Sequence, residues 1–486
     1  MGLAFVPVYI KFLGIEAYGL IGIFAILQAW LTLLDLGMTP ALSREMARFT
    51  AGAHNAESIR DLLRSLEIIG FAIAAAIVLG IVACSSWLAS SWLRSEYLPA
   101  DAIAHALAAM GVVTALRFIE NIYSSSVAGL QRQVLLNGVT SIMATARGLG
   151  AIAILAWVSR TIEAFFAWQC LISLITIPVL AGLVYGRLPP STRTARFSLP
   201  ALLGVWRFAA GMLLITVLAL LLTQVDKILL SRLLPLKDFA YYTLAGVIAN
   251  TLYMLAAPIS VAFYPRFTEL VTRKDDLALR QVYHQAAQLV TVIVGSAAIV
   301  AIVFGKRLLM LWSADAGLTQ HVAPLLGIMT GGTLLNALMG MPYEIQLAHR
   351  WTTLTITVNI IAVALLIPAI FWIAPRYGAI GAAWVWVILN GGYLIFVAYF
   401  MHRRILKKEK WRWYSSDLAI PLLAAIVSAL VCRSIIPANL GRFSEFLALL
   451  VGALAVLMAA AFAASIVRLQ MIQFIRSKIS PIFRES

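Results

Sequence analysis

Long apolar runs, each followed by a short polar break, recur from one end of this chain to the other. The clearest run extends from Ala17 to Leu36, about twenty residues, which as a helix would cross a hydrocarbon core of roughly 30 Å. It closes at Asp35, Gly37 and Pro40 and leads into the charged segment SREMAR, which must lie at a membrane surface. Since the backbone of a span must satisfy its own hydrogen bonds, such runs predict transmembrane helices.

The composition excludes a soluble globule. The 486 residues are 62% hydrophobic and 12% charged, which leaves too little polar side chain to cover a water-soluble surface. The net charge of +16 is typical of basic cytoplasmic loops in bacterial membrane proteins, and no nucleic-acid motif accompanies it, so no nucleic-acid partner is expected. Cys84, Cys170 and Cys432 lie in apolar runs without metal-ligand spacing, so neither a metal site nor a disulfide is expected.

Apolar windows predict an all-α, polytopic membrane protein and give no support for strands. Fourteen helices are expected, over residues 1–13, 17–38, 67–89, 103–129, 134–158, 162–186, 205–231, 239–263, 282–304, 322–347, 352–374, 378–401, 415–436 and 444–467. The longest breaks, 39–66, 187–204, 264–281 and 305–321, are too short for a folded extramembrane domain. Any chemistry is therefore expected within or just beside the bilayer.

The first expected helix is short, because only thirteen residues, roughly 20 Å of helix, precede Gly14. We expect a helix that has lost residues through a mis-called start codon or a genuine truncation. The alternative is a short, tilted or interfacial segment. The opening has neither a charged n-region nor an A-x-A site, so no cleavable signal peptide is expected.

Charge and aromatic residues indicate how the chain lies in the membrane. Most of the 37 Lys and Arg residues fall in loops after even-numbered helices and in the tail, which predicts cytoplasmic termini. Tryptophans near expected helix ends predict an interfacial belt made of Trp87, Trp92, Trp157, Trp206, Trp312, Trp351, Trp372, Trp411 and Trp413.

A weak internal repeat aligns Glu16 with Asp238 and Arg44 with Arg266 at one common offset. Six helices per repeat predict two parallel six-helix bundles related by an axis along the membrane normal, with a central cleft. The expected organisation is an N-terminal lobe 1–186, a cytoplasmic linker 187–204, a C-terminal lobe 205–401, a basic cytoplasmic loop 402–414, and two extra helices with a cytoplasmic tail, 415–486.

Four segments resemble one family of membrane transporters. They are VPVYIKFLGIEAYGLIGIF, the elbow LLDLGMTPALSREMAR, TQVDKILLSRLLPLKDFAYYTLA and RYGAIGAAWVWV. With them the chain resembles, over nearly its whole length, the polysaccharide transporter family of the multidrug/oligosaccharidyl-lipid/polysaccharide exporter superfamily. The resemblance implies a flippase for O-antigen or exopolysaccharide repeat units carried on undecaprenyl diphosphate.

Moving a diphosphate through hydrocarbon requires a polar cavity with cations, so Arg and Lys inside helices are the candidate ligands. Arg147 is closest to the middle of its helix and has small neighbours that leave room for substrate; the alternative is a pair with a carboxylate on a neighbouring helix. Arg117 precedes Glu120 by one turn, which permits an internal pair. Lys227 and Asp226 are adjacent and do not share a helix face, so one can face the cleft while the other meets a partner.

Each remaining candidate residue can also be explained without a role in transport, as a surface charge or as a structural residue. Arg207 can snorkel to the interface from a first turn, and Arg44 is either a diphosphate ligand at the cytoplasmic mouth or a solvated topology charge. Glu344 follows Pro342, which frees a carbonyl one turn earlier and predicts a cation or proton site; the alternative is a kinked helix end. Asp35 either serves ion coupling or orients the elbow through Arg44. Asp226 and Glu120 complete the acids proposed for ion coupling or pairing.

Sequence and resemblance together predict a bacterial inner-membrane flippase that works by alternating access. No G-x-x-x-x-G-K-[ST] motif occurs, so coupling to proton or sodium exchange is expected in place of ATP hydrolysis. The alternative is an ion-coupled multidrug exporter with a carboxylate-dominated cavity. A polymerase or ligase is not expected, because no long exterior loop carries clustered histidines and carboxylates. Expected partners are lipid-linked oligosaccharide, membrane lipids, and polysaccharide polymerase and chain-length machinery, with no cofactor.

Overall fold

The chain is helical in nearly all of its described residues. The computed structural model describes residues 2–35, 37–50, 55–96, 98–189, 193–200, 202, 217, 220–221, 223–437 and 439–479, and no strand occurs among these. The prediction of an all-α fold is confirmed. Contacts divide the chain into two compact units, Met1–Ala240 and Tyr241–Ser486.

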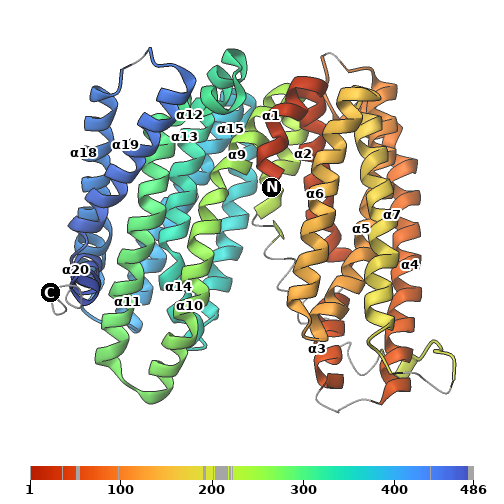
Figure 1. The fold of residues 1–486 in the computed structure, drawn as a ribbon, viewed down its shortest axis with the longest axis horizontal. Coiled ribbons are helices and arrows are strands. Elements are labelled where there is room, and N and C mark those ends of the chain that lie inside the picture. Colours follow the sequence, from red (N-terminus) through yellow and green to blue (C-terminus); the bar gives the residue numbers. More distant parts are fainter. Residues whose placement is uncertain are drawn as a thin grey trace. The chain divides into compact units, whose positions relative to one another are not determined.

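The first unit consists mainly of long helices that lie side by side (Figure 1). Its helices are α1 (Gly2–Leu13), α2 (Ile15–Leu34), α3 (Met38–Thr50), α4 (Ala56–Trp87), α5 (Ala100–Gly129), α6 (Gln133–Trp157) and α7 (Ile162–Tyr185), and the π-helical turn η1 (Leu88–Trp92) extends α4. Helix α5 packs against α4 on one side and against α7 on another. It is therefore central to this unit.

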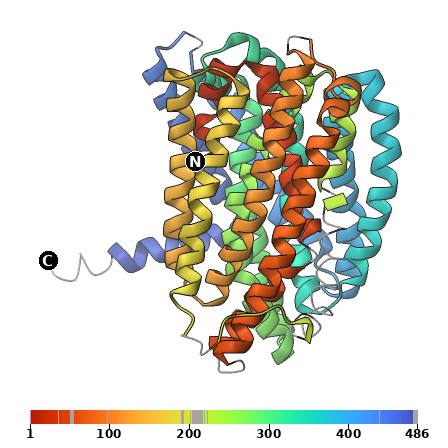
Figure 2. The same ribbon diagram turned by 90° about the vertical axis from the view of Figure 1, so that its right-hand side faces the viewer.

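The second unit begins within α9 (Leu236–Ala249). Its other elements are α10 (Thr251–Arg273), α11 (Asp276–Val290), η2 (Thr291–Gly295), α12 (Ser296–Ser313), α13 (Ala316–Leu338), α14 (Gly340–Ala348), α15 (Thr353–Gly392), η3 (Tyr393–Val397), α16 (Ala398–Arg404), α17 (Lys410–Arg412), η4 (Trp413–Ala419), α18 (Ile420–Ile435), α19 (Arg442–Ala463) and α20 (Ser465–Ile479). Figures 1 and 2 show α20 lying crosswise to the long helices of this unit.

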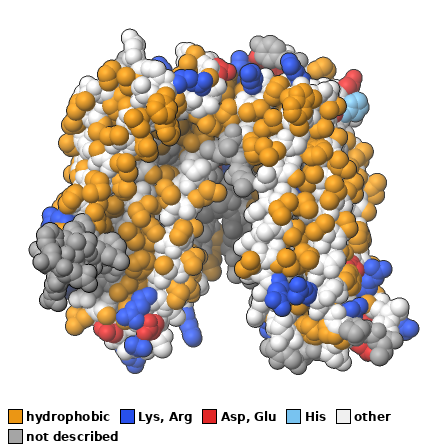
Figure 3. All heavy atoms as spheres, viewed as in Figure 1, with side chains coloured by type: hydrophobic (Ala, Val, Ile, Leu, Met, Phe, Trp, Pro, Cys, Tyr) orange, Lys and Arg blue, Asp and Glu red, His pale blue; other side chains and the backbone are white. Residues whose placement is uncertain are grey.

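Ten helices in the described part of the chain are long and apolar enough to cross a membrane. Hydrophobic side chains cover the visible lengths of the helices, while Lys, Arg, Asp and Glu gather near helix ends (Figure 3). The chain is therefore a multi-pass membrane protein, as predicted. The count of fourteen spans stays a prediction, because much of the expected helix 205–231 lies outside the described residues.

The predicted break at 39–66 is wrong, since most of it is helical. Helix α3 occupies Met38–Thr50, and α4 begins at Ala56, where the Asn55 side chain accepts a hydrogen bond from the Ser58 amide at 2.7 Å. Such a side-chain cap satisfies an amide at the helix start that has no helical partner. Hydropathy windows end at the first charges, whereas a capped helix continues beyond the hydrocarbon.

The breaks expected at 264–281 and 305–321 are shorter than predicted for the same reason. Helix α10 continues to Arg273 and α12 to Ser313, and each ends at a residue in the left-handed conformation, Lys274 (φ 57°) and Ala314 (φ 55°). The helices expected at 352–374 and 378–401 are two helices separated by a kink at Gly378 (φ 59°, ψ −150°), although the label α15 spans it as one element. Glycine adopts this backbone conformation without a Cβ clash, so it allows the turn between the two halves.

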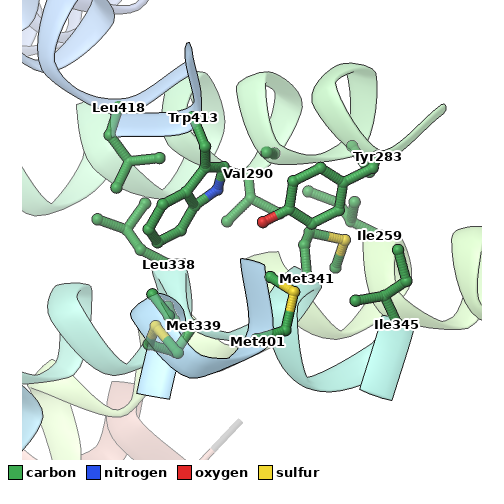
Figure 4. Packing of buried hydrophobic residues seen from close by; sticks show 14 of the residues in the cluster. Ile259, Tyr283, Val290, Leu338, Met339, Met341, Ile345, Met401, Trp413 and Leu418 are labelled. Carbon is green, nitrogen blue, oxygen red and sulfur yellow. The ribbon is translucent and has the colours of Figure 1, made fainter. Parts of the chain in front are cut away.

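Each unit has its own apolar core. Phe118, Ile122 and Leu63 are buried in the first unit, where α4 and α5 pack together. Trp413 and Tyr283 are fully buried in the second unit among Leu, Ile and Met side chains (Figure 4).

The assignment of Trp413 to an interfacial belt is therefore wrong. Its indole packs 5.2 Å from the imidazole of His402 inside the core, whereas Trp411 is 73% exposed. The two residues follow each other closely along the chain but point to different sides of the helical segment that begins at Lys410. Trp206, another expected belt residue, lies outside the described residues.

Candidate functional site

Two of the predicted cations of the first unit, Arg117 and Arg147, lie in a polar cluster formed by α5, α6 and α7. Arg147 on α6 donates from Nη2 to both carboxylate oxygens of Glu120 on α5, at 2.6 and 2.8 Å, and to Ser173 Oγ on α7 at 3.3 Å. The side chains of Arg147 and Glu120 are 18% and 10% exposed. The alternative interpretation of Arg147, a pair with a carboxylate on a neighbouring helix, matches this geometry.

Arg117 lies beside this pair but has neutral partners. Its Nη2 donates to Gln169 Oε1 on α7 at 3.2 Å, and its guanidinium carbon lies 5.1 Å from the centre of the Phe24 ring on α2. A cation over an aromatic face is attracted by the ring quadrupole. The spacing of Arg117 and Glu120 permitted an internal pair, but the carboxylate accepts its hydrogen bonds from Arg147.

The cluster carries more positive than negative charge. Two guanidinium groups, Arg117 and Arg147, accompany one carboxylate, Glu120. The Nε atom of each arginine is buried and has no hydrogen-bond partner within the described part of the chain. A buried donor left unsatisfied costs about 1–3 kcal/mol. An anion whose oxygens accepted hydrogen bonds from these two Nε atoms would satisfy them.

Glycines allow the neighbouring helices to approach Arg147 closely. A Cβ on Gly148 would lie 2.2 Å from Cε2 of Phe5 on α1, and one on Gly150 would lie 2.1 Å from Cζ2 of Trp168 on α7. Trp168 Nε1 also donates to the Ala146 carbonyl at 3.1 Å. The expectation that small neighbours leave room for substrate is thus wrong at these two glycines, because aromatic rings occupy the space.

The polar face of α7 was missed from the sequence. Gln169, Ser173 and Thr176 are buried and follow the i, i+4, i+7 spacing of one helix face. Gln169 and Ser173 contact the two arginines. A polar stripe on an otherwise apolar span was the signal that could have identified them.

The residues of the elbow form a separate group, with Asp35 buried and Arg44 half exposed. Asp35 accepts hydrogen bonds from the Thr39 amide at 3.2 Å and from the Thr39 hydroxyl at 2.8 Å, so it caps α3. The Arg44 side chain is 50% exposed, with Nε 4.0 Å from Glu45 Oε1. In the described contacts Asp35 therefore orients the elbow through Thr39, whereas the sequence suggested Arg44 as its partner.

Lys227 donates from Nζ to the Thr223 carbonyl at 2.8 Å and to Gln224 Oε1 at 3.2 Å. Lys227 belongs to the unit Met1–Ala240, which also holds Arg117 and Arg147. Its neighbour Asp226 is half-buried. Arg207 lies outside the described residues.

Glu344 lies on α14 of the second unit and forms a side-chain hydrogen bond with Ser260 on α10. Pro342 stands in the first turn of α14, after α13 has ended at Leu338. A proline in a first turn removes little helical hydrogen bonding. The proline therefore marks the start of a new short helix, with Glu344 near that start.

Comparison with known proteins identifies the family. The family model named "Polysaccharide biosynthesis protein" matches residues 1–271, more than half of the chain. The chain belongs to this family. The matched region includes α5, α6 and α7, and therefore the whole arginine cluster.

One curated relative and two solved structures resemble this chain over most of its length. A Shigella flexneri protein named "Putative O-antigen transporter" is 20% identical over 77% of this chain and 87% of its own length. An inward-facing multidrug resistance MATE family transporter of the MOP superfamily matches with a TM-score of 0.70 at 11% identity, over 84% of this chain and 95% of its own. The lipid II flippase MurJ, inward closed, matches with a TM-score of 0.68 at 13% identity, over 94% and 96%. The two structures establish a shared fold.

The first unit has a second charged cluster, formed by residues of α4, α5 and α7. Buried Glu67 accepts hydrogen bonds from Tyr123 at 2.9 Å and Tyr185 at 2.7 Å and pairs with Arg64 at 3.1 Å. Nearby, Arg193 pairs with Glu57 at 3.1 Å and with Asp61, and the hydrogen bond to Glu57 raises the pKa of Arg193. In both groups the carboxylates are already occupied by donors, so these contacts are structural.

Proposed function

We propose that this protein is a flippase that moves undecaprenyl-diphosphate-linked oligosaccharide repeat units across the bacterial inner membrane by alternating access. The observation that carries the proposal is the buried cluster of Arg117, Arg147 and Glu120, with its excess positive charge and two unsatisfied guanidinium donors. In this proposal Arg117 and Arg147 bind the diphosphate. Lys227 and Arg44 are secondary candidates for contact with the same group.

A diphosphate needs such a site because hydrocarbon solvates charge poorly. An isolated ionised group in a low-dielectric medium is strongly disfavoured, whereas guanidinium groups form charge-assisted, bidentate hydrogen bonds with phosphate oxygens. Arg117 is the better ligand of the two, since its described partners are a neutral amide and an aromatic ring. Arg147 would share its guanidinium between Glu120 and the substrate.

The family and the named relatives support transport of a glycan precursor. The Shigella relative is named for O-antigen transport, and one structural neighbour is a lipid II flippase. The MATE likeness supports the fold equally well and would suit the alternative, an ion-coupled drug exporter. The cluster favours the flippase, because its single carboxylate is already bound by Arg147 and leaves no excess negative charge for a cationic drug.

Ion coupling is part of the same proposal. Glu344, Asp226, Asp35 and Glu120 are the acids proposed for ion coupling or pairing, and of these Glu344 is our first candidate for proton or sodium exchange. Cytoplasmic termini, and association with polysaccharide polymerase and chain-length machinery, are proposed as well. The protein would move its substrate without making or breaking covalent bonds.

The test uses a strain from which the gene is deleted, in which inner-membrane polyprenyl-diphosphate glycans are extracted and their sidedness is measured. The proposal expects complete repeat units to accumulate facing the cytoplasm. Wild type should reverse the accumulation, and Arg117→Gln should not, although it is expressed and inserted. Absence of accumulation, together with greater sensitivity to cationic drugs, would replace the flippase with the exporter.

A further inference from the structure

Another buried polar cluster lies in the second unit and has no part in the function proposed above. His284 on α11 is fully buried, and each of its ring nitrogens lies against a carboxylate. Nδ1 is hydrogen-bonded to Asp417 on η4, which is also fully buried, and Nε2 lies 3.1 Å from Glu409 Oε2. These three residues are called the His284 triad below.

The two carboxylate neighbours determine how many protons the triad holds. A neutral imidazole has one N–H donor and one bare nitrogen, and an ionised carboxylate only accepts hydrogen bonds. A neutral His284 would therefore direct one lone pair at a carboxylate oxygen. Consider a triad made of a neutral imidazole and two ionised carboxylates. Both contacts become hydrogen bonds only when this triad takes up one additional proton.

The charges around the triad bear on which of its three groups holds that proton. Arg280 and Arg412 lie 3.5 and 3.9 Å from the Glu409 carboxylate and place positive charge beside it. Gln288 donates from Nε2 to Asp417 Oδ1 at 2.9 Å, which suits an ionised carboxylate as well. His284 between two ionised carboxylates is then an imidazolium with two donors.

Other charged or titratable groups packed around the triad are engaged elsewhere. Lys410 Nζ lies over the rings of Tyr399 and Trp411, at 4.9 and 4.6 Å. Tyr414 donates to the Leu394 carbonyl at 2.6 Å, and Arg468 on α20 donates to the Phe462 carbonyl at 3.3 Å. The charge balance at His284 is therefore set by Arg280, Glu409, Arg412 and Asp417.

A second buried histidine in the same core provides a contrast. His402 Nδ1 lies 2.7 Å from the Ala398 carbonyl, which can only accept, and its Nε2 lies 3.2 Å from the Tyr283 hydroxyl, which can donate. One donor and one acceptor satisfy these partners, so His402 fits a neutral imidazole. Burial alone does not distinguish the two histidines, since both are almost completely buried; their partners do.

The triad also joins segments that are distant in the sequence. Glu409 and Asp417 flank the start of the helical segment leading into α18, and His284 ties both to α11. Gln288, one turn after His284, accepts from the Ile466 amide of α20 at 2.9 Å while it donates to Asp417. Loss of the proton would leave a lone pair facing a carboxylate and weaken these links. The links of α11 to residues 409–417 and to α20 are thus present while the proton is bound and are lost on deprotonation.

We propose that the His284 triad is a proton-binding site, in which His284 holds the proton as an imidazolium and thereby fastens residues 409–417 and the start of α20 to α11. The ligand is a proton, bound by an imidazole between two carboxylates. Two π-helical turns, η2 and η4, accompany the site, a feature often found at functional positions. The proposal is independent of the flippase function and of the coupling role proposed for Glu344.

The test is nitrogen NMR of the full-length wild-type protein in lipid nanodiscs at pH 7.5, with all six histidines labelled with ¹⁵N and ¹³C. Carbonyl-labelled tyrosine identifies His284, because Tyr283–His284 is the single Tyr–His step in the sequence, and carbonyl-labelled methionine identifies His402 through the single Met–His step, Met401–His402. We expect two protonated ring nitrogens on His284 and one on His402. A bare ring nitrogen on His284 would overturn the proposal.

Variants then test whether the triad links these segments to α11. Asp417→Asn and Glu409→Gln should each remove one proton from the His284 ring at the same pH and increase hydrogen exchange in residues 409–420 and 465–470. His105→Gln, at an exposed histidine of α5, is the matched control and should change neither signal. An unchanged imidazolium in both carboxylate variants would contradict the role of the triad. The wild-type spectrum decides the protonation state even where a variant fails to fold.

Discussion

Arg147 and Glu120 form an ion pair between α6 and α5, in which one guanidinium nitrogen, Nη2, donates to both carboxylate oxygens at 2.6 and 2.8 Å. The pair lies inside a helix bundle of a membrane protein, where a lone charge is costly. It explains how an arginine near the middle of α6 is tolerated. It also means that a variant of Arg147 changes both the fold and any anion site, so the two effects have to be separated.

Removing either partner of this pair should destabilise the protein, because the other charge is then buried alone. Arg147→Gln and Glu120→Gln should each lower the free energy of unfolding by about 3 kcal/mol, the lower end of the range for a buried pair, because Arg147 is partly exposed. The double variant should recover much of that loss. Thermal unfolding in detergent measures this. A loss in the double variant equal to the sum of the two single losses would show that the ion pair contributes little.

Arg117→Gln should impair transport with a much smaller effect on folding, because the partners of Arg117 are neutral. Loss of a hydrogen bond to a charged ligand costs about 1.5–3 kcal/mol, which corresponds to roughly ten- to a hundredfold weaker diphosphate binding. Binding of a polyprenyl diphosphate to the protein in nanodiscs is the measurement. Arg132→Gln, at an exposed arginine just before α6, is the control, and equal effects of both changes would argue against a site at Arg117.

Gly148→Ala should destabilise the packing of α1 on α6, since the new Cβ would lie 2.2 Å from the Phe5 ring. Overpacking of this kind costs about 1–3 kcal/mol. Gly138→Ala in the same helix is the matched control, because a Cβ there meets nothing within 4 Å. Unfolding temperatures should fall for the first variant and not for the second. Adding Phe5→Ala to Gly148→Ala should restore part of the loss.

Glu344→Gln should uncouple transport from the ion gradient if Glu344 carries the coupling ion. The variant should transport at a low rate that ionophores no longer change, whereas the wild-type rate should fall when the gradient is dissipated. Repeat-unit transport in proteoliposomes with imposed gradients measures both. Glu445→Gln, at a partly exposed acid in the first turn of α19, is the control. A wild-type rate indifferent to ionophores and to the Glu344 change would rule out this coupling role.

The amino-acid sequence by itself determined the class of fold and the approximate position of most helices. Runs such as Ala17–Leu36 can satisfy their backbone in hydrocarbon only as helices, so hydropathy is sufficient for that step. It was insufficient at helix ends. The cap of Asn55 on α4 and the left-handed ends at Lys274 and Ala314 depend on local hydrogen bonds that an average over an apolar window does not register.

The candidate residues were partly predictable for a similar reason. A charge inside an apolar run is visible in the sequence, which identified Arg117, Arg147 and Glu120. Their pairing was not, because Arg147 contacts a carboxylate 27 residues away on another helix. The same limit applies to Phe5 against Gly148 and to His284 against Asp417, where packing of distant segments brings the groups together. Periodicity describes which faces of one helix are apolar, whereas the partner of each polar group is chosen by helix packing. Only the tertiary structure therefore decided which charges are neutralised and which remain available.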